Sequence, residues 1–168
     1  MIFNTFISDY EEKISEENRI LIANFFIMFS RFEYALKTTT FARNSNGRVV
    51  ANWESFVASI RNDFDKEKNA NIKSAVDFLL DYPPKTQQLL DNNLCFQDDE
   101  LQDNVPEINK LDVYIRRIRN NLFHGGKIYG YFDDGLRNPQ LLKFAMIILE
   151  EWLELSEGVK NQFLKKLE

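Results

Sequence analysis

Apolar residues recur every three or four positions over much of this chain, which is the spacing of one face of an α-helix. The most regular run lies between Pro106-Glu107, a pair suited to begin a helix, and Gly125-Gly126, a pair suited to end one. Its apolar positions are Ile108, Leu111, Ile115, Ile118 and Leu122. The pattern therefore predicts a helix between these two signals, with a continuous apolar stripe that faces the core.

The same spacing predicts helices over about 19–37, 53–64, 71–80 and 138–157, with short pieces around 89–90 and 159–167. In the first of these, the expected core positions are Ile22, Phe25, Phe26, Phe29, Phe32 and Leu36. Ser15 to Asn18 is suited to cap the first of these helices, and Gly158 to end the last long one. Polar residues at 38–47 predict a loop, and an Asp-Gly pair makes 127–135 compatible with a small hairpin. The predicted fold is one all-α domain over 1–168, an up-and-down bundle of four to five main helices with short extra helices.

Composition agrees with this expectation and limits the partners. The 168 residues include 15 Phe but only 6 Gly and 4 Pro, which favours long helices around an aromatic core. The net charge of −5 gives no overall attraction to nucleic acid, so any such contact requires a local basic patch. The acidic N-terminal region resembles no secretory signal, and no apolar run approaches the length of a membrane span. We expect a cytoplasmic protein without membrane contact.

The only histidine, His124, lies five residues after Arg119 and four after Asn120. Imidazole changes charge near neutral pH, and guanidinium can neutralise a phosphate. Together they suit RNA cleavage by the RNA's own 2′-hydroxyl: His124 takes the proton, a step that typically contributes about 10²–10⁴-fold, and Arg119 stabilises the phosphorane. The Asn120 amide could orient the phosphate or the imidazole. This chemistry requires no metal and no other cofactor.

Helix geometry qualifies this hypothesis. Asn120 and His124 are i, i+4 neighbours on the face opposite the apolar stripe, whereas Arg119 flanks the stripe about 140° away from His124. Convergence of Arg119 and His124 therefore requires a loosened last turn or a long reach by the arginine. One histidine cannot easily act as base and acid in one step. A homodimer that places two such helix ends side by side would supply both.

Positive charge is concentrated around this segment. Between positions 110 and 127 the chain has five cationic residues, Lys110, Arg116, Arg117, Arg119 and Lys127, against only Asp112. We predict that Arg116, Arg117 and Lys127 contact RNA.

The segment 119–125 resembles the defining motif of the HEPN (higher eukaryotes and prokaryotes nucleotide-binding) superfamily, in which an arginine and a polar residue precede a histidine. Residues 29–37 resemble the early helix of stand-alone bacterial HEPN families, including some related to phage defence. The resemblance implies that Arg119 and His124 form the catalytic pair, with Asn120 as the adjacent polar residue and Glu33 as an auxiliary acid. It also implies a metal-independent endoribonuclease, homodimeric with a composite site, that acts as a toxin or antiviral effector with an antitoxin or regulatory partner.

Structural interpretations of the same residues stay open. A histidine in the last turn of a helix is favoured by the helix dipole, and Arg119 could form an ion pair with Glu33. The alternatives to an enzyme are therefore a non-catalytic module that binds a nucleotide or RNA, and a scaffold that only dimerises.

Overall fold

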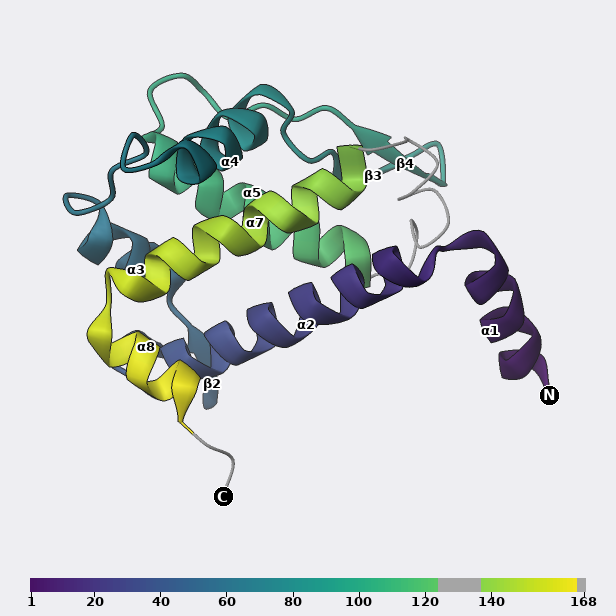
Figure 1. Cartoon of the computed structure of the whole chain (residues 1–168), viewed down its shortest axis with the longest axis horizontal. Coiled ribbons are helices and arrows are strands. Elements are labelled where there is room, and N and C mark those ends of the chain that lie inside the picture. The colour runs from purple at the N-terminus through teal and green to yellow at the C-terminus, as the bar shows by residue number, and fades with distance from the viewer. Residues whose placement is uncertain (124–136, 166–168) are drawn as a thin grey trace.

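The computed structural model describes residues 1–123 and 137–165, which form seven helices and two antiparallel hairpins (Figure 1). The helices are α1 (Ile2–Lys13), α2 (Glu16–Lys37), α3 (Trp53–Ile60), α4 (Ala70–Asp81), α5 (Glu107–Phe123), α7 (Arg137–Glu154) and α8 (Glu157–Leu164). The strands are β1 (Ala42–Ser45), β2 (Arg48–Ala51), β3 (Thr86–Leu90) and β4 (Asn93–Gln97).

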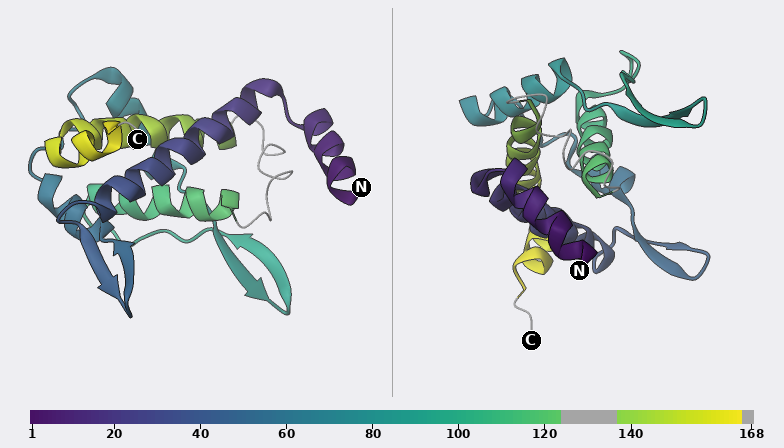
Figure 2. Two further views of the ribbon diagram at one scale, coloured as in Figure 1. Left: turned by 90° about the horizontal axis from the view of Figure 1, so that it is seen from below. Right: turned by 90° about the vertical axis from the view of Figure 1, so that its right-hand side faces the viewer.

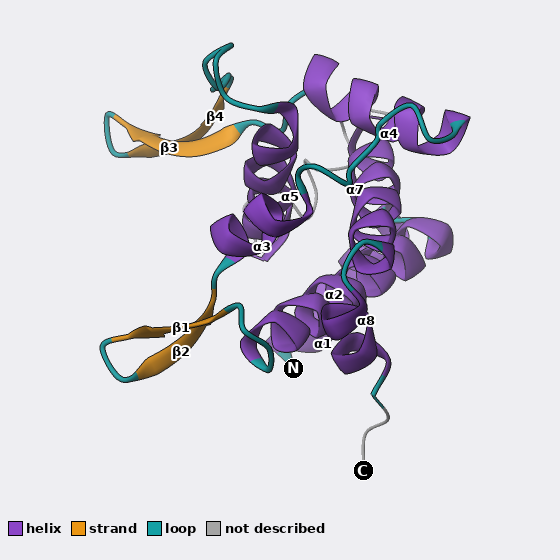
Figure 3. Ribbon diagram, turned by 90° about the vertical axis from the view of Figure 1, so that its left-hand side faces the viewer, coloured by secondary structure: helices purple, strands orange, loops and turns teal. Residues whose placement is uncertain are grey.

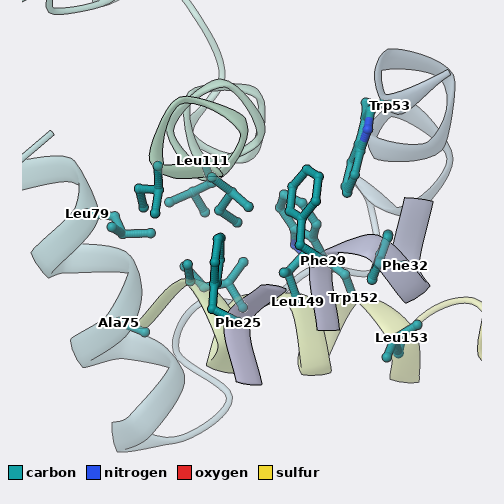
Figure 4. Close-up of a cluster of buried hydrophobic side chains, with 14 of the residues drawn as sticks. Phe25, Phe29, Phe32, Trp53, Ala75, Leu79, Leu111, Leu149, Trp152 and Leu153 are labelled. Carbon is teal, nitrogen blue, oxygen red and sulfur yellow. The ribbon is translucent and has the colours of Figure 1, made fainter. Parts of the chain in front are cut away.

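Helix α7 lies at the centre of the helical packing. It contacts α2, α4, α5 and α8, so it is apolar on several sides. Its fully buried residues are Leu142, Ala145, Ile148, Leu149 and Trp152. Figure 4 shows Leu149 and Trp152 beside the phenylalanines of α2 and Leu111 of α5. One continuous core therefore joins elements that are far apart in the sequence.

The predicted apolar stripes are confirmed at most positions. All five stripe residues of α5 are buried, and so are Phe25, Phe29 and Phe32 of α2. Phe26 was expected in the core as well, but it is 45% exposed. The predicted cap of α2 is also present, because the Ser15 hydroxyl accepts a hydrogen bond of 3.3 Å from the backbone N–H of Asn18.

The prediction of an all-α bundle is wrong, because two antiparallel hairpins accompany the helices. β1 pairs with β2, and β3 pairs with β4. Each hairpin turns through two residues with positive φ, Asn46 (51°) with Gly47 (79°) and Asp91 (48°) with Asn92 (61°). Two such residues give a turn whose twist matches that of the paired strands. The expected loop at 44–47 therefore contains a hairpin turn, and the expected short helix at 89–90 is the end of β3.

Both hairpins project from the same side of the molecule, one on either side of α5 (Figures 2 and 3). The remaining long helices pack on the other side of α5. The outer face of α5 thus lies between two protruding hairpins, and this position determines which of its side chains reach the surface.

Other helical predictions also differ from the structure. The predicted helix over 53–64 is too long, because α3 ends at Ile60. Helix α7 ends at Glu154, and Gly158 lies inside α8 instead of ending the long helix. Helix α1 was not predicted; none of its residues is buried, and it extends away from the bundle (Figure 1). The hairpin considered at 127–135 lies outside the described residues.

Across residues 1–123 and 137–165, no helix combines the length and the apolar character needed to cross a bilayer.

We expect that Phe32→Ala lowers the free energy of unfolding by about 3–5 kcal/mol, the usual cost of emptying a buried aromatic site. Phe32 is fully buried, with its ring 5.1 Å from that of Trp53 and 5.3 Å from that of Phe56. Tyr34→Ala, in the same helix but 50% exposed, is the matched control and should cost about 1 kcal/mol or less. Urea unfolding of both variants makes the comparison, and equal losses would contradict this core assignment.

Candidate functional site

A surface hollow of about 260 Å³ lies where α5 passes α2 and the first hairpin. Of the described residues, nine from four elements line it: Phe29, Glu33 and Lys37 of α2, Val50 and Ala51 of β2, Trp53 of α3, and Arg116, Arg119 and Asn120 of α5. The structure therefore brings together four of the residues singled out from the sequence, namely Arg116, Arg119, Asn120 and Glu33.

Helical spacing explains how α2 and α5 supply these side chains. Residues four apart lie above one another on a helix, so Phe29, Glu33 and Lys37 form one line on α2. Arg116 lies three residues before Arg119 and four before Asn120, so these also share one side of α5. The two lines face each other across the hollow, and Trp53 lies at its edge as the first residue of α3.

Arg119 occupies the boundary between the core and the surface. Its guanidinium carbon is 5.7 Å from the centre of the Phe29 ring, and its Nη1 donates a hydrogen bond of 3.0 Å to Oδ1 of Asn120. Asn120 is exposed, as expected for the face opposite the apolar stripe. Arg119 and Asn120 thus present a cation and an amide side by side at the hollow.

Glu33 is the only carboxylate among the described residues that line this hollow. Its Oε1 accepts from Nε1 of Trp53 at 3.5 Å, and its Oε2 lies 3.9 Å from Nζ of Lys37. Both distances are at the long end for such contacts, and a carboxylate has about four acceptor positions. Glu33 is therefore held in place while its oxygens keep acceptor capacity toward the hollow.

Arg116 is fixed by a buried carboxylate. Its Nε and Nη2 each donate to Asp112, both at 2.9 Å, and the Asp112 residue is only 4% exposed. Burial raises the pKa of Asp112 above its ordinary value of 3.8, and the Arg116 charge and hydrogen bonds offset part of this rise. Glu54 adds a smaller contribution that also raises the pKa. The pair holds the Arg116 guanidinium at the rim of the hollow.

Arg117 points to a different part of the molecule. Its guanidinium donates to the backbone carbonyls of Pro84 at 3.1 Å and Asp99 at 2.7 Å, and to the Asp99 carboxylate at 2.9 Å. Its side chain is 11% exposed. Arg117 therefore fastens both ends of the second hairpin to α5, and its contact with RNA stays a prediction. Asn121 has a similar role, because its amide donates to the Lys85 carbonyl at 2.7 Å.

His124 and Lys127 lie outside the described residues, so the predicted convergence of Arg119 with His124 lies outside them as well. The helix that carries Arg119 and Asn120 is described up to Phe123. Within the described ranges, no group of three or more His, Cys, Asp or Glu side chains is placed to hold a metal ion.

Trp53, Phe29 and Lys37 line the hollow, yet they were not predicted as site residues. The sequence contains a signal for two of them, because Phe29 and Lys37 lie four residues before and after Glu33. Trp53 carries no such signal. It reaches the hollow because the first hairpin returns the chain to α2, and this hairpin was predicted as a loop.

No family model, curated protein or solved structure matches the chain. The HEPN resemblance is carried by residues 29–37 and 119–125 of this sequence alone.

We expect the pH dependence of stability to show the burial of Asp112. Because its folded-state pKa is raised, the native chain holds this proton more tightly than the unfolded chain does. As pH rises from 3.8 through the folded-state pKa, the contribution of Asp112 to the free energy of unfolding should decrease.

Urea unfolding of the wild type and of Asp112→Asn between about pH 3.5 and 7 measures this contribution. The wild type should lose stability relative to Asp112→Asn as pH rises through that window. Asp77→Asn, which removes a carboxylate with a 44% exposed side chain on α4, serves as the control. A wild type that gains stability relative to Asp112→Asn over the same window would contradict the assigned direction.

Proposed function

We propose that this protein is a metal-independent endoribonuclease that cleaves RNA through attack of the 2′-hydroxyl. One observation carries the proposal: Arg119 and Asn120 line a hollow that also holds Lys37 and Arg116, and both lie within five residues of His124 in the chain. A phosphate-binding surface and a group able to move a proton near neutral pH thus lie on one short segment.

In the proposed reaction, the His124 imidazole accepts the proton of the 2′-hydroxyl, and the 2′-oxygen attacks the adjacent phosphorus. The bond from phosphorus to the 5′-oxygen then breaks, and that oxygen takes up a proton as it leaves. The products are a 2′,3′-cyclic phosphate and a 5′-hydroxyl. Arg119 stabilises the negative charge that develops on the phosphoryl oxygens, and Asn120 positions the phosphate through its amide.

The charge of the hollow supports an anionic substrate. Among the described residues that line it, three are cationic (Lys37, Arg116 and Arg119) and one is a carboxylate (Glu33), although the Arg116 charge is paired with buried Asp112. The chain as a whole has a net charge of −5, so this concentration of positive charge is local. A local cationic surface is the feature that a phosphate backbone requires.

Two observations support a homodimer. The chain has one histidine, whereas the reaction uses both a base and an acid. In addition, an apolar groove of about 620 Å³ runs between α1 and α2 and reaches Leu122 at the end of α5. Its walls include Phe6 and Phe26, which are 40% and 45% exposed. Burial of this groove in a dimer would bring two α5 ends close together.

The biological setting of the proposal, a toxin or antiviral effector controlled by an antitoxin or another regulatory partner, rests on the HEPN resemblance. A non-catalytic module that binds a nucleotide or RNA is the main alternative, because the hollow could bind a phosphate without any chemistry at His124. The experiments below separate the two.

We expect the purified protein to cleave single-stranded RNA in EDTA and to leave 2′,3′-cyclic phosphate ends. His124→Ala should abolish cleavage, because it removes the base. Arg119→Ala should slow cleavage by about 10²–10³-fold, the usual cost of removing one group that stabilises transition-state charge. Gel analysis of labelled RNA and chemical analysis of the product ends provide the measurements.

Arg61→Ala is the control for loss of a positive charge, because Arg61 bonds to Asn109 at 3.0 Å and does not line the hollow. It should cleave at the wild-type rate. Cleavage that persists in the His124→Ala, Arg119→Ala double variant would show that the site is elsewhere. If the wild type binds RNA without cleaving it, the binding-module alternative is correct.

We expect Phe26→Glu to convert a dimer into a monomer and to lower the cleavage rate, because a charge in the apolar groove opposes its burial. Leu89→Glu, at the 69% exposed end of the second hairpin, is the matched control and should do neither. Light scattering coupled to size exclusion measures the oligomeric state. A wild-type monomer that is fully active would rule out the composite site.

A further inference from the structure

We infer that the hollow selects a guanine base and that Glu33 is the residue that recognises it. The inference rests on the proposed function for the identity of the substrate as RNA. It assigns Glu33 to specificity, a role different from the auxiliary acid that the family resemblance implies.

The size of the hollow limits what can enter it. Its volume of about 260 Å³ is below the usual range of about 300–1,000 Å³ for sites that enclose drug-sized molecules. The lining combines the rings of Phe29 and Trp53 with cationic groups. Phe29 and Trp53 are buried, at 3% and 5% exposure, and the Arg119 guanidinium lies over Phe29. The planar group offered to the hollow is therefore the guanidinium, and unstacked RNA bases commonly bind on such planes. One nucleotide fits this description better than a duplex does.

The chemistry of a carboxylate distinguishes the four bases. Glu33 offers only acceptors, so it binds an edge that presents donors. Guanine presents two parallel donors, N1–H and the N2 amino group, which match the two carboxylate oxygens. Adenine and cytosine each place a ring acceptor beside their amino group, and uracil places a carbonyl on either side of its N3–H. Each of these three bases would therefore set an acceptor against the carboxylate.

The contacts of Glu33 prepare it for this role. Trp53 and Lys37 each approach one of its oxygens, at 3.5 and 3.9 Å, so the carboxylate is oriented without being saturated. The Glu33 side chain is 27% exposed, which leaves it accessible from the hollow. Across the hollow, Arg116 and Arg119 are placed to bind the phosphate while Glu33 binds the base.

The test is equilibrium binding of 3′-GMP, 3′-AMP, 3′-CMP and 3′-UMP to the purified chain, measured by calorimetry. We expect 3′-GMP to bind about tenfold or more tightly than the other three, the range expected for one good bidentate base contact. Glu33→Gln keeps the shape of the side chain but replaces one acceptor oxygen by a donor. In this variant the preference should shrink to about threefold or less, while the weaker affinity common to the four nucleotides persists.

Glu17→Gln, a change at an 82% exposed carboxylate in the same helix, is the matched control and should keep the full preference for 3′-GMP. Equal affinity for the four nucleotides in the wild type overturns the inference, and so does a preference that survives Glu33→Gln. RNA cleavage without any preference for 3′-GMP would leave the proposed function standing and refute the base assignment. A Glu33-dependent preference in a protein that does not cleave RNA would support the base assignment and refute the nuclease.

Discussion

The stacking of Trp53 on two phenylalanines of α2 determines the shape of the candidate site. The indole ring lies 5.1 Å from that of Phe32, nearly parallel at 7°, and 5.3 Å from that of Phe29 at 24° (Figure 4). Aromatic pairs of this kind add about 0.5–1.5 kcal/mol beyond the burial of their surface. The nitrogen edge of the same indole reaches Glu33. One side chain thus joins α3 to α2 through the core and also forms part of the wall of the hollow.

Two arginines of α5 are held in place by hydrogen bonds to carboxylates. Buried Asp112 holds Arg116 at the rim, and Arg117 fastens the second hairpin to α5. Removal of the Asp112 carboxylate from water costs free energy, and this cost offsets the stabilisation that its ion pair with Arg116 provides. The pair therefore need not make the fold more stable. Its geometric effect is clearer, because an arginine held by two hydrogen bonds loses less freedom when it binds a phosphate. The site therefore combines one arginine fixed by two hydrogen bonds with a carboxylate that keeps acceptor positions free.

The sequence predicted the helices better than the hairpins or the full site. The stripe of α5 follows directly from residue spacing, because burial of one helix face requires that period. The hairpins were missed although Asn46-Gly47 is a strong turn signal, because it was interpreted as the end of α2 rather than as a connection between strands. Arg119, Asn120 and Glu33 could be singled out from the sequence. Trp53 could not, because it joins them only through the return of the first hairpin to α2.

The chain as a whole is acidic, whereas the described residues that line the hollow are mainly cationic. This difference determines how the proposed RNA substrate would bind. A net charge of −5 gives a polyanion no long-range attraction, and each exposed charge acts over only about 8 Å at physiological salt. With three cations among the described lining residues, the hollow can neutralise few phosphates, so the nonspecific affinity of the proposed site should be small. Binding of the proposed RNA substrate would then depend on short-range contacts inside the hollow. Because such contacts distinguish one base from another whereas phosphate contacts do not, a weakly cationic site on an acidic protein favours selectivity over affinity.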